Sequence, residues 1–293
     1  MLPTVRALTT HLVKTLASTI HPLDQRWFEA ELLVGFVLGQ DRMWVTLHPD
    51  AILTTKQLTA ISKLVERRIA HEPLAYLFKQ APFFGRVFFV DKRVLIPRPE
   101  SERLVQSALE SIDTGTAWAL WDVGTGSGCL ALSVAASVPA LSVIASDRST
   151  SALEVAKKNA KRFELTRVTF TTGSLLAPSV KRWLRTQQEK HWFILANLPY
   201  LPPADQAKMQ TQVTDYEPLS ALFAEEEGLR LINELLEQLK VFLTGRTGDI
   251  ILLEHDPRQA TKLARQAKIL FPEARVTTEL DHNTAKRFTR VET

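Results

Sequence analysis

The pattern of hydrophobic and polar positions divides the chain into a helical first part and an alternating second part. Apolar residues recur at helical spacing over residues 5–20 and 27–39, and again from about Thr55 to residue 70. The third segment is expected to end before Pro73, because the residue that precedes a proline disfavours the helical conformation. The first 73 residues therefore predict a small helical bundle.

Residues 74–99 differ in character from the segments on either side. The stretch FFGRVFFVDKRVLI is rich in aromatic and β-branched residues and has a polar, turn-like centre, which predicts a β-hairpin. Proline and charge then gather in IPRPESE, a loop in which Glu100 or Ser101 is a candidate cap for a helix over about residues 100–112.

From Trp118 onwards, short apolar strands alternate with amphipathic helices. The strands are expected at residues 117–124, 141–147, 167–173, 192–200 and 248–255, and the helices at residues 129–138, 151–163 and 228–243. This alternation predicts βαβ units and a mostly parallel sheet. Residues 100–293 are therefore expected to form an α/β domain.

Composition and charge narrow the class of protein only slightly. A hydrophobic content of 45% with 23% charged residues indicates a folded chain. The excess of four positive charges, from 36 basic and 32 acidic residues, is too small to indicate a nucleic-acid partner. One cysteine, Cys129, permits no internal disulfide and is expected to be a packing residue. Without a signal-peptide pattern or the roughly 20 apolar residues of a membrane span, a cytoplasmic protein is expected.

Three glycines mark a candidate ligand-binding turn at the start of the α/β region. The segment WDVGTGSG places Gly124, Gly126 and Gly128 between a strand and a helix, where glycine permits a tight turn and close approach of a ligand. The helix that follows offers unpaired amide donors, which suit the carboxylate of an amino-acid-like cofactor. The spacing lacks the G-x-G-x-x-G dinucleotide fingerprint. Asp147, about 20 residues further on, is placed either to bind ribose hydroxyls or to cap the next helix.

A second candidate site is the tetrapeptide Asn197, Leu198, Pro199 and Tyr200, which follows an apolar strand. Open α/β sheets bind their ligands at the carboxyl ends of strands. A planar amide or aryl amine is a weak nucleophile, and a site can activate it by accepting both of its hydrogens, here through the Asn197 side-chain oxygen and the Leu198 carbonyl. Tyr200 would pack on the flat face of the substrate group. A simple turn at a strand end is the alternative interpretation.

These motifs resemble those of the peptide chain release factor glutamine methyltransferases, also called HemK or PrmC. The resemblance covers nearly the whole chain and is strongest over about residues 65–255. The segments that carry it are RRIAHEPLAYL, FFGRVFFVDKRVLIPRPESE, DVGTGSGCLALS, SDRSTSALEVAKKNA, ANLPY and DYEPLSALFAEEEGL. Of these, IPRPESE is far more specific than the glycine-rich turn.

The resemblance implies a fold and a domain organisation. It implies a Rossmann-like class I methyltransferase domain of the α/β class, with a mostly parallel seven-stranded sheet, at residues 100–293. A linking β-hairpin at residues 74–99 would join it to an N-terminal helical substrate-docking domain at residues 1–73.

The resemblance also implies a reaction and its site. S-adenosylmethionine would donate a methyl group to the side-chain amide nitrogen of the glutamine in the GGQ motif of release factors. The cofactor-binding residues would be Gly124, Thr125, Gly126, Ser127, Gly128, Asp147, Leu175 and Asn197. Residues 197–200 would hold the glutamine amide.

Two positions depart from the pattern of that family. Leu198 stands where the family usually has the first proline of Asn-Pro-Pro-Tyr, so the carbonyl remains but loop rigidity is reduced. Ser174 and Leu175 stand where an acidic residue and often an aromatic one lie near the adenine, so the cofactor loses a polar or stacking partner. Asn197 remains, and activity is still expected.

Three other functions share some of these features. A sister family methylates a glutamine of a ribosomal large-subunit protein, and IPRPESE favours the release-factor branch over it. An adenine-amine methyltransferase of DNA or RNA uses a similar tetrapeptide but needs a basic surface to bind phosphates. The sequence shows no stripe of basic residues that would form one. A non-catalytic binding protein with the same fold is the third alternative.

The remaining expectations concern partners and the walls of the site. Release factors are the expected partners of a monomeric protein, with no direct nucleic acid, no membrane and no metal, because the seven histidines lack ligand spacing. Arg98 and Glu100 are expected to fix their loop through an ion pair or to line the substrate channel. Glu217 and Pro218 are expected to shape the far wall of the pocket.

Overall fold

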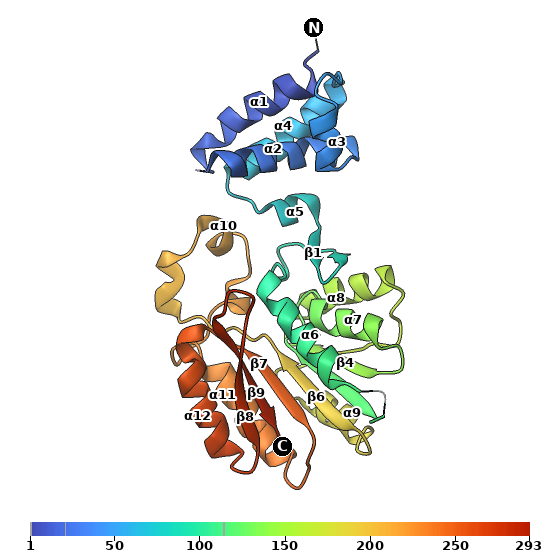
Figure 1. Ribbon diagram of the computed structural model, residues 1–293, viewed down its shortest axis with the longest axis vertical. Helices are drawn as coiled ribbons and strands as arrows, with labels where there is room; N and C mark the ends of the chain where they lie inside the picture. Colours follow the sequence, from blue (N-terminus) through green and yellow to red (C-terminus); the bar gives the residue numbers. More distant parts are fainter. Residues whose placement is uncertain (1, 21, 114) are drawn as a thin grey trace. The chain divides into compact units, whose positions relative to one another are not determined.

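The computed structural model describes residues 2–20, 22–113 and 115–293, and the chain divides into two compact units (Figure 1). The first unit comprises Met1–Lys79 and Thr211–Tyr216. The second comprises Gln80–Gln210 and Glu217–Thr293. Within the described ranges, no helix combines the length and the apolar composition needed to cross a membrane.

The first unit is helical, as the apolar periodicity predicted. Its helical segments are α1 (Val5–Thr15), η1 (Leu16–Ser18), α2 (Leu23–Leu38), α3 (Arg42–Leu47), α4 (Thr55–Ile69), α5 (Leu74–Phe78) and α10 (Thr211–Thr214). A capping box starts α4, because Thr54 Oγ1 accepts from the amide of Gln57 at 3.3 Å and Gln57 Oε1 accepts from the amide of Thr54 at 2.8 Å. The short α10 segment belongs to this unit, where the Tyr216 hydroxyl donates to the Ala70 carbonyl at 2.5 Å.

An ion pair lies inside this helical unit. Arg68 on α4 donates through Nε to Glu29 Oε2 on α2 at 2.6 Å and through a terminal nitrogen to Glu29 Oε1 at 3.2 Å. Both residues are buried, at 6% and 4% exposure, beside an apolar cluster that includes Leu33 and Ile61. Gln25 Nε2 also donates to Glu29 at 3.1 Å. The ion pair therefore links α2 to α4, and both of its charges have little access to water.

The structure corrects the predicted start of the hairpin. Residues 74–78 form α5, in which Phe78 stacks on Phe36 of α2 with ring centroids 4.4 Å apart. Pro73 is the N-cap of this short helix: its backbone is extended, and its carbonyl accepts from the amide of Leu77 at 3.1 Å. The hairpin itself consists of β1 (Ala81–Phe83) and β2 (Arg86–Phe88). The helical unit thus extends to residue 79 instead of ending at residue 73.

The second unit contains a seven-stranded sheet in the order β5-β4-β3-β6-β7-β9-β8. Its strands are β3 (Trp118–Val123), β4 (Ser142–Asp147), β5 (Thr169–Thr172), β6 (His191–Ala196), β7 (Ile250–Glu254), β8 (Arg275–Leu280) and β9 (Lys286–Glu292). The first five are parallel, and β9 pairs antiparallel with both β7 and β8. The mostly parallel α/β fold predicted from the sequence is therefore confirmed.

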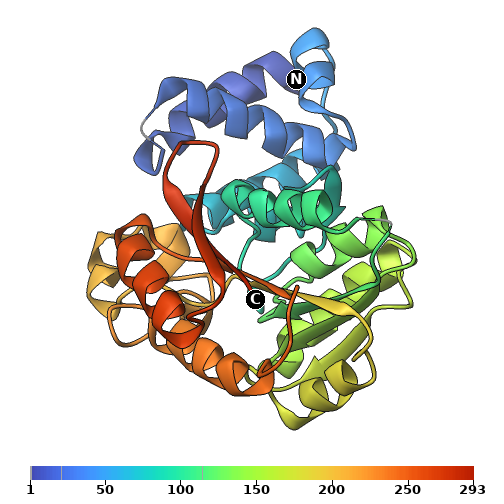
Figure 2. The same cartoon turned by 60° about the horizontal axis from the view of Figure 1, so that its bottom comes forward.

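Helices cover both faces of this sheet. They are α6 (Glu102–Ser111), α7 (Cys129–Ser137), α8 (Thr150–Arg162), α9 (Pro178–Arg185), α11 (Arg230–Phe242) and α12 (Ala260–Leu270). The short helical turns are η2 (Pro99–Ser101), η3 (Pro203–Lys208), η4 (Leu219–Ala221) and η5 (Pro257–Gln259). Two apolar clusters pack α6 and α7 on one face, and α9, α11 and α12 on the other. In Figure 2 the sheet separates the green helices from the orange and red ones.

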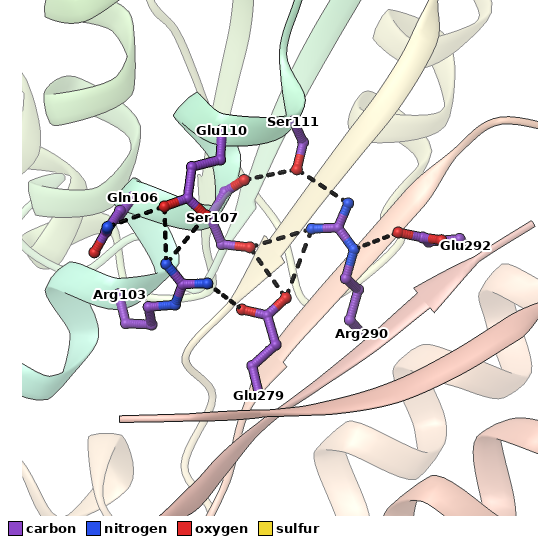
Figure 3. Close-up of polar contacts among 8 residues, drawn as sticks. All are labelled: Arg103, Gln106, Ser107, Glu110, Ser111, Glu279, Arg290 and Glu292. Carbon is purple, nitrogen blue, oxygen red and sulfur yellow. Dashed lines mark hydrogen bonds and ion pairs between the residues drawn. The ribbon is translucent and has the colours of Figure 1, made fainter. Parts of the chain in front are cut away.

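A polar network fixes α6 to the antiparallel edge of the sheet (Figure 3). Buried Ser107 donates to Glu279 at 3.2 Å and accepts from Arg290 at 3.1 Å. Arg103 also donates to Glu279, at 3.2 Å, and Arg290 to Ser111, at 3.0 Å. The network therefore joins α6 to β8 and β9.

Replacing Arg68 with alanine is expected to lower the stability of the helical unit by about 3–5 kcal/mol, because Glu29 would remain buried without its partner. Hydrogen exchange of amides in α2 and α4 measures this loss. Arg6→Ala is the matched control: its side chain is 67% exposed in a 3.9 Å pair with Asp50, and its loss should cost less than about 1 kcal/mol. Equal protection in the two variants would contradict the importance of the buried pair.

Candidate functional site

A cavity of about 430 Å³ opens at the carboxyl ends of β3, β4, β5 and β6. It brings together most of the residues that the sequence predicted for a site. Those that line it are Gly124, Thr125, Gly126, Ser127, Asp147, Leu175, Asn197, Leu198 and Pro199. Gly128 and Tyr200 are not among the lining residues. The glycine-rich turn and the tetrapeptide therefore share one cavity, although more than 60 residues of sequence separate them.

The buried carboxyl group of Asp122 organises the glycine-rich turn. Its Oδ2 accepts from Thr125 Oγ1 at 2.6 Å and from the amide of Ala131 at 3.2 Å. Burial raises the pKa of Asp122 to about 6. The amides of Gly124 and Thr125 donate to the carbonyl of Ser146 on β4, at 2.8 and 2.9 Å. No role was predicted for Asp122 from the sequence. An acidic residue inside an apolar strand was nevertheless a signal of a structural or functional role.

Asp147, the last residue of β4, holds the opposite side of the turn. One carboxylate oxygen accepts from the amide of Gly126 at 2.9 Å, and the other accepts from the amide of Ser149 at 2.8 Å. Ser149 is the N-cap of α8, since its own Oγ accepts from the amide of Ala152. Asp147 therefore supports the start of α8 and also lines the cavity, where each oxygen has a second lone pair to offer.

Gly128 has a packing role in this structure. Its φ is +82°, and an added Cβ would lie 3.2 Å from the Cβ of Ala156 on α8 and 3.0 Å from Leu132. Glycine therefore permits both the turn and the close approach of α7 to α8.

Ser127 and Cys129 differ in what they present to the cavity. The Ser127 hydroxyl is buried and has no nitrogen or oxygen partner among the described residues, so it is suited to a polar ligand. Burial raises the pKa of the Cys129 thiol to about 12, which leaves it protonated and unreactive. In the part of the chain that the structure describes, no three His, Cys, Asp or Glu side chains gather in a way that suits a metal ion.

Asn197 follows β6 and points its amide nitrogen at Ser101. Asn197 Nδ2 donates to Ser101 Oγ at 2.9 Å, so the side-chain oxygen lies on the other side of the planar amide group. The next side chain, Leu198, is 5% exposed and packs beside Gly124, where an added Cβ would lie 3.0 Å from Leu198 Cδ2. The tetrapeptide is therefore packed directly against the glycine-rich turn.

Ser101 does not cap α6, and the structure corrects that prediction. Its backbone is already helical, with φ −68° and ψ −11°, because η2 precedes α6 without a break. The Ser101 hydroxyl instead donates to Glu254 Oε2 at 2.7 Å. Tyr200 also donates to Glu254, through its hydroxyl at 3.2 Å, which directs the tyrosine toward the end of β7. Burial raises the pKa of Glu254 to about 7 and raises that of Tyr200 as well.

Comparison with known proteins matches both units of the chain. Residues 11–78 match the family described as the PrmC N-terminal domain, and residues 121–216 match the one described as a methyltransferase domain. A release factor glutamine methyltransferase of Koribacter versatilis is 37% identical over 210 residues, covering 72% of each chain. That of Chlorobaculum tepidum is 37% identical, covering 69% of this chain and 70% of its own. The chain belongs to the release factor glutamine methyltransferase family.

A solved structure supports the methyltransferase fold of this member of the release factor glutamine methyltransferase family. The catalytic domain of human METTL16, solved in complex with an RNA hairpin, superposes with a TM-score of 0.55 over 84% of this chain and 83% of its own. The two sequences are 15% identical, so the likeness concerns the fold alone.

The signature loop of the family, IPRPESE here, forms another wall of the cavity. Arg98 lines the cavity and pairs with the buried carboxylate of Glu217 at 2.6 Å. Glu217 also accepts from the amide of Ile96 at 3.1 Å, and Pro218 lines the cavity beside it. The ion pair expected for this loop therefore joins Arg98 to Glu217 and not to Glu100. Leu175 also lines the cavity, with a left-handed backbone at φ +47°, which is uncommon for leucine.

Gly228 limits how far the tetrapeptide can move. Its φ is +87°, and an added Cβ would lie 1.9 Å from the carbonyl oxygen of Tyr200. Gln259 Nε2 donates to the same Tyr200 oxygen at 2.7 Å. A side chain at position 228 would therefore displace both the Tyr200 backbone and its hydrogen bond.

Gly228→Ala is expected to destabilise the second unit by about 2–5 kcal/mol, from left-handed strain and overpacking together. It should also lower enzymatic activity, because Tyr200 lies three residues after Asn197. Gly245→Ala is the control: φ there is +79° but an added Cβ meets nothing within 4 Å, so only about 1–2 kcal/mol of strain is expected. Urea unfolding compares the two variants, and equal destabilisation would show that Tyr200 does not restrict position 228.

Proposed function

We propose that this protein transfers a methyl group from S-adenosylmethionine to the side-chain amide nitrogen of the glutamine in the GGQ motif of peptide chain release factors. The observation that carries the proposal is the position of Asn197. Its amide nitrogen is bound by Ser101, and it lines the same cavity as the glycine-rich turn. Membership of the release factor glutamine methyltransferase family supports the same substrate.

The residues of the cavity fit S-adenosylmethionine. Ser127 offers a buried hydroxyl without a nitrogen or oxygen partner among the described residues, which suits the amino-acid end of the cofactor. Asp147 would accept from the ribose hydroxyls, as acidic residues after the second strand do in such folds. Leu175 would contribute an apolar wall for the adenine. When bound, S-adenosylmethionine supplies a methyl group attached to a positively charged sulfur.

The tetrapeptide would hold the acceptor amide. The Asn197 side-chain oxygen would accept one hydrogen of the glutamine NH2 group, and the Leu198 carbonyl would accept the other. These acceptors fix the direction of the nitrogen lone pair and stabilise the positive charge that develops on nitrogen. The buried Leu198 side chain, packed beside Gly124, would limit the movement of this loop.

The helical unit would dock the release factor. Its match to the PrmC N-terminal domain supports this docking role. Several large apolar side chains are exposed on it, among them Leu23, Met43, Leu47 and Ile52. Exposed apolar groups of this kind suit a protein partner. The protein would act as a cytoplasmic monomer.

Labelled S-adenosylmethionine and a purified release factor test the proposal directly. Label is expected on the intact factor and not on one whose GGQ glutamine is changed to alanine. Asn197→Ala should lower the rate about 100- to 1000-fold, the usual effect of losing a group that stabilises transition-state charge. Asn233→Ala, on α11 outside the cavity, should leave the rate unchanged. Equal labelling of the two release factors would show that the acceptor is a different group.

Asp147→Ala is expected to weaken S-adenosylmethionine binding about 10- to 100-fold, because hydrogen bonds to a carboxylate contribute about 1.5–3 kcal/mol. Isothermal titration calorimetry measures the change. Asp113→Ala is a matched control, since Asp113 also accepts from two backbone amides, at 2.9 and 2.7 Å, but lies outside the cavity. Unchanged affinity in Asp147→Ala would exclude Asp147 from the cofactor site.

A further inference from the structure

A chain of hydrogen bonds links Asn197 to the buried carboxyl group of Glu254. Asn197 Nδ2 donates to Ser101 Oγ at 2.9 Å, and Ser101 Oγ donates to Glu254 Oε2 at 2.7 Å. The Tyr200 hydroxyl donates to the other oxygen of Glu254 at 3.2 Å. Ser101 and Glu254 are buried, at 2% and 1% exposure, so water has little access to the bond between them.

The charge of Glu254 determines the direction of this chain. A hydroxyl has one hydrogen, and a carboxylate can only accept. When Glu254 is charged, the Ser101 hydrogen is directed to Glu254 and Ser101 can only accept from Asn197. The Asn197 amide must then turn its nitrogen toward Ser101 and its oxygen away from it.

Protonation of Glu254 removes this constraint. A protonated Glu254 can donate to Ser101, and the Ser101 hydrogen can then turn toward Asn197. The Asn197 amide becomes able to flip and to present its NH2 group where its oxygen lay. An NH2 group opposite the NH2 of a substrate amide cannot accept a hydrogen bond from it.

We propose that Ser101 and Glu254 are positioning residues, which orient the Asn197 amide so that its oxygen faces the acceptor. This inference deepens the proposed function and rests on it. It gives the signature loop a role in the reaction, because Ser101 is the serine of IPRPESE. Neither residue lies in the tetrapeptide or in the glycine-rich turn.

The surroundings of Glu254 make this orientation sensitive to pH near neutrality. Burial raises the pKa of Glu254 to about 7; Glu100 of η2 also raises it, and Arg287 of β9 lowers it. Other titratable groups of this region are Tyr200 after β6, whose pKa is raised, and Cys129 of α7, whose pKa is raised to about 12. Burial also lowers the pKa of His255 and raises that of Asp122 on β3 to about 6. Tyr200, Cys129 and His255 are neutral at pH 7, and Asp122 changes charge near pH 6, so Glu254 is the group that changes charge at about pH 7. The carboxylate, and with it the productive Asn197 orientation, is favoured above about pH 7.

Steady-state kinetics of methyl transfer to the release factor test the inference. Ser101→Ala is expected to lower kcat about 10- to 100-fold, as the loss of a supporting hydrogen bond does, with little change in KM for S-adenosylmethionine. Ser101→Thr should restore kcat, since its hydroxyl can make both bonds. In the wild type kcat should rise with pH through about 7, and Glu254→Gln should remove this rise.

Ser107→Ala is the matched control for Ser101→Ala. Ser107 lies on α6, is 1% exposed and also exchanges hydrogen bonds with charged side chains, Glu279 and Arg290 (Figure 3). Ser107 is outside the cavity, so the kcat of Ser107→Ala should match that of the wild type. An equal loss of kcat in Ser101→Ala and Ser107→Ala would overturn the inference, because stability alone would then explain both.

A measurement without the acceptor separates this inference from the proposed function. The side-chain NH2 signals of Asn197, assigned by their absence in Asn197→Ala, should shift with pH near 7 in the wild type but not in Glu254→Gln. If the wild type fails to label release factors and this shift still occurs, the proposed function fails and the orientation by Ser101 and Glu254 stands. If the Asn197 signals of the wild type do not shift with pH, the inference is overturned. This outcome does not depend on whether Ser101→Ala folds.

Discussion

Carboxyl groups at the ends of the parallel strands organise the site. Asp122, Asp147 and Glu254 lie at or near the last residues of β3, β4 and β7. Asp122 and Glu254 are buried and Asp147 is half-buried, and hydrogen bonds offset the cost of removing such groups from water. Asp122 and Asp147 take theirs from the glycine-rich turn, and Glu254 takes its own from Ser101 and Tyr200. The hydrogen bonds that these three carboxyl groups accept therefore set the conformation of the loops that form the cavity.

The sequence was sufficient for the parallel part of the fold. Strands β3, β4, β6 and β7 are apolar runs buried on both faces, and such runs are readable without a structure. The antiparallel strands β8 and β9 were not located, because charged residues alternate with apolar ones along them and their pairing is nonlocal. The short helix α5 was missed because five residues give too little periodicity to recognise.

The site was predictable in its local motifs but not in its long-range contacts. The glycine-rich turn and the tetrapeptide each occupy a few consecutive residues, and the structure places both at one cavity. The bonds from Asn197 to Ser101 and from Ser101 to Glu254 span 96 and 153 residues, which no spacing rule anticipates. The assignments of individual cavity residues to cofactor or substrate stay predictions.

The position of β9 has a consequence for how the protein is made. This strand follows the other six in the sequence, yet it lies between β7 and β8 and is the only neighbour of β8 in the described sheet. During synthesis, β7 has an open edge until the ribosome has made residues 286–292. Because Glu254 ends β7 and pairs opposite Phe288, the part of the site around this carboxyl group takes its final form only after residues 286–292 have been made.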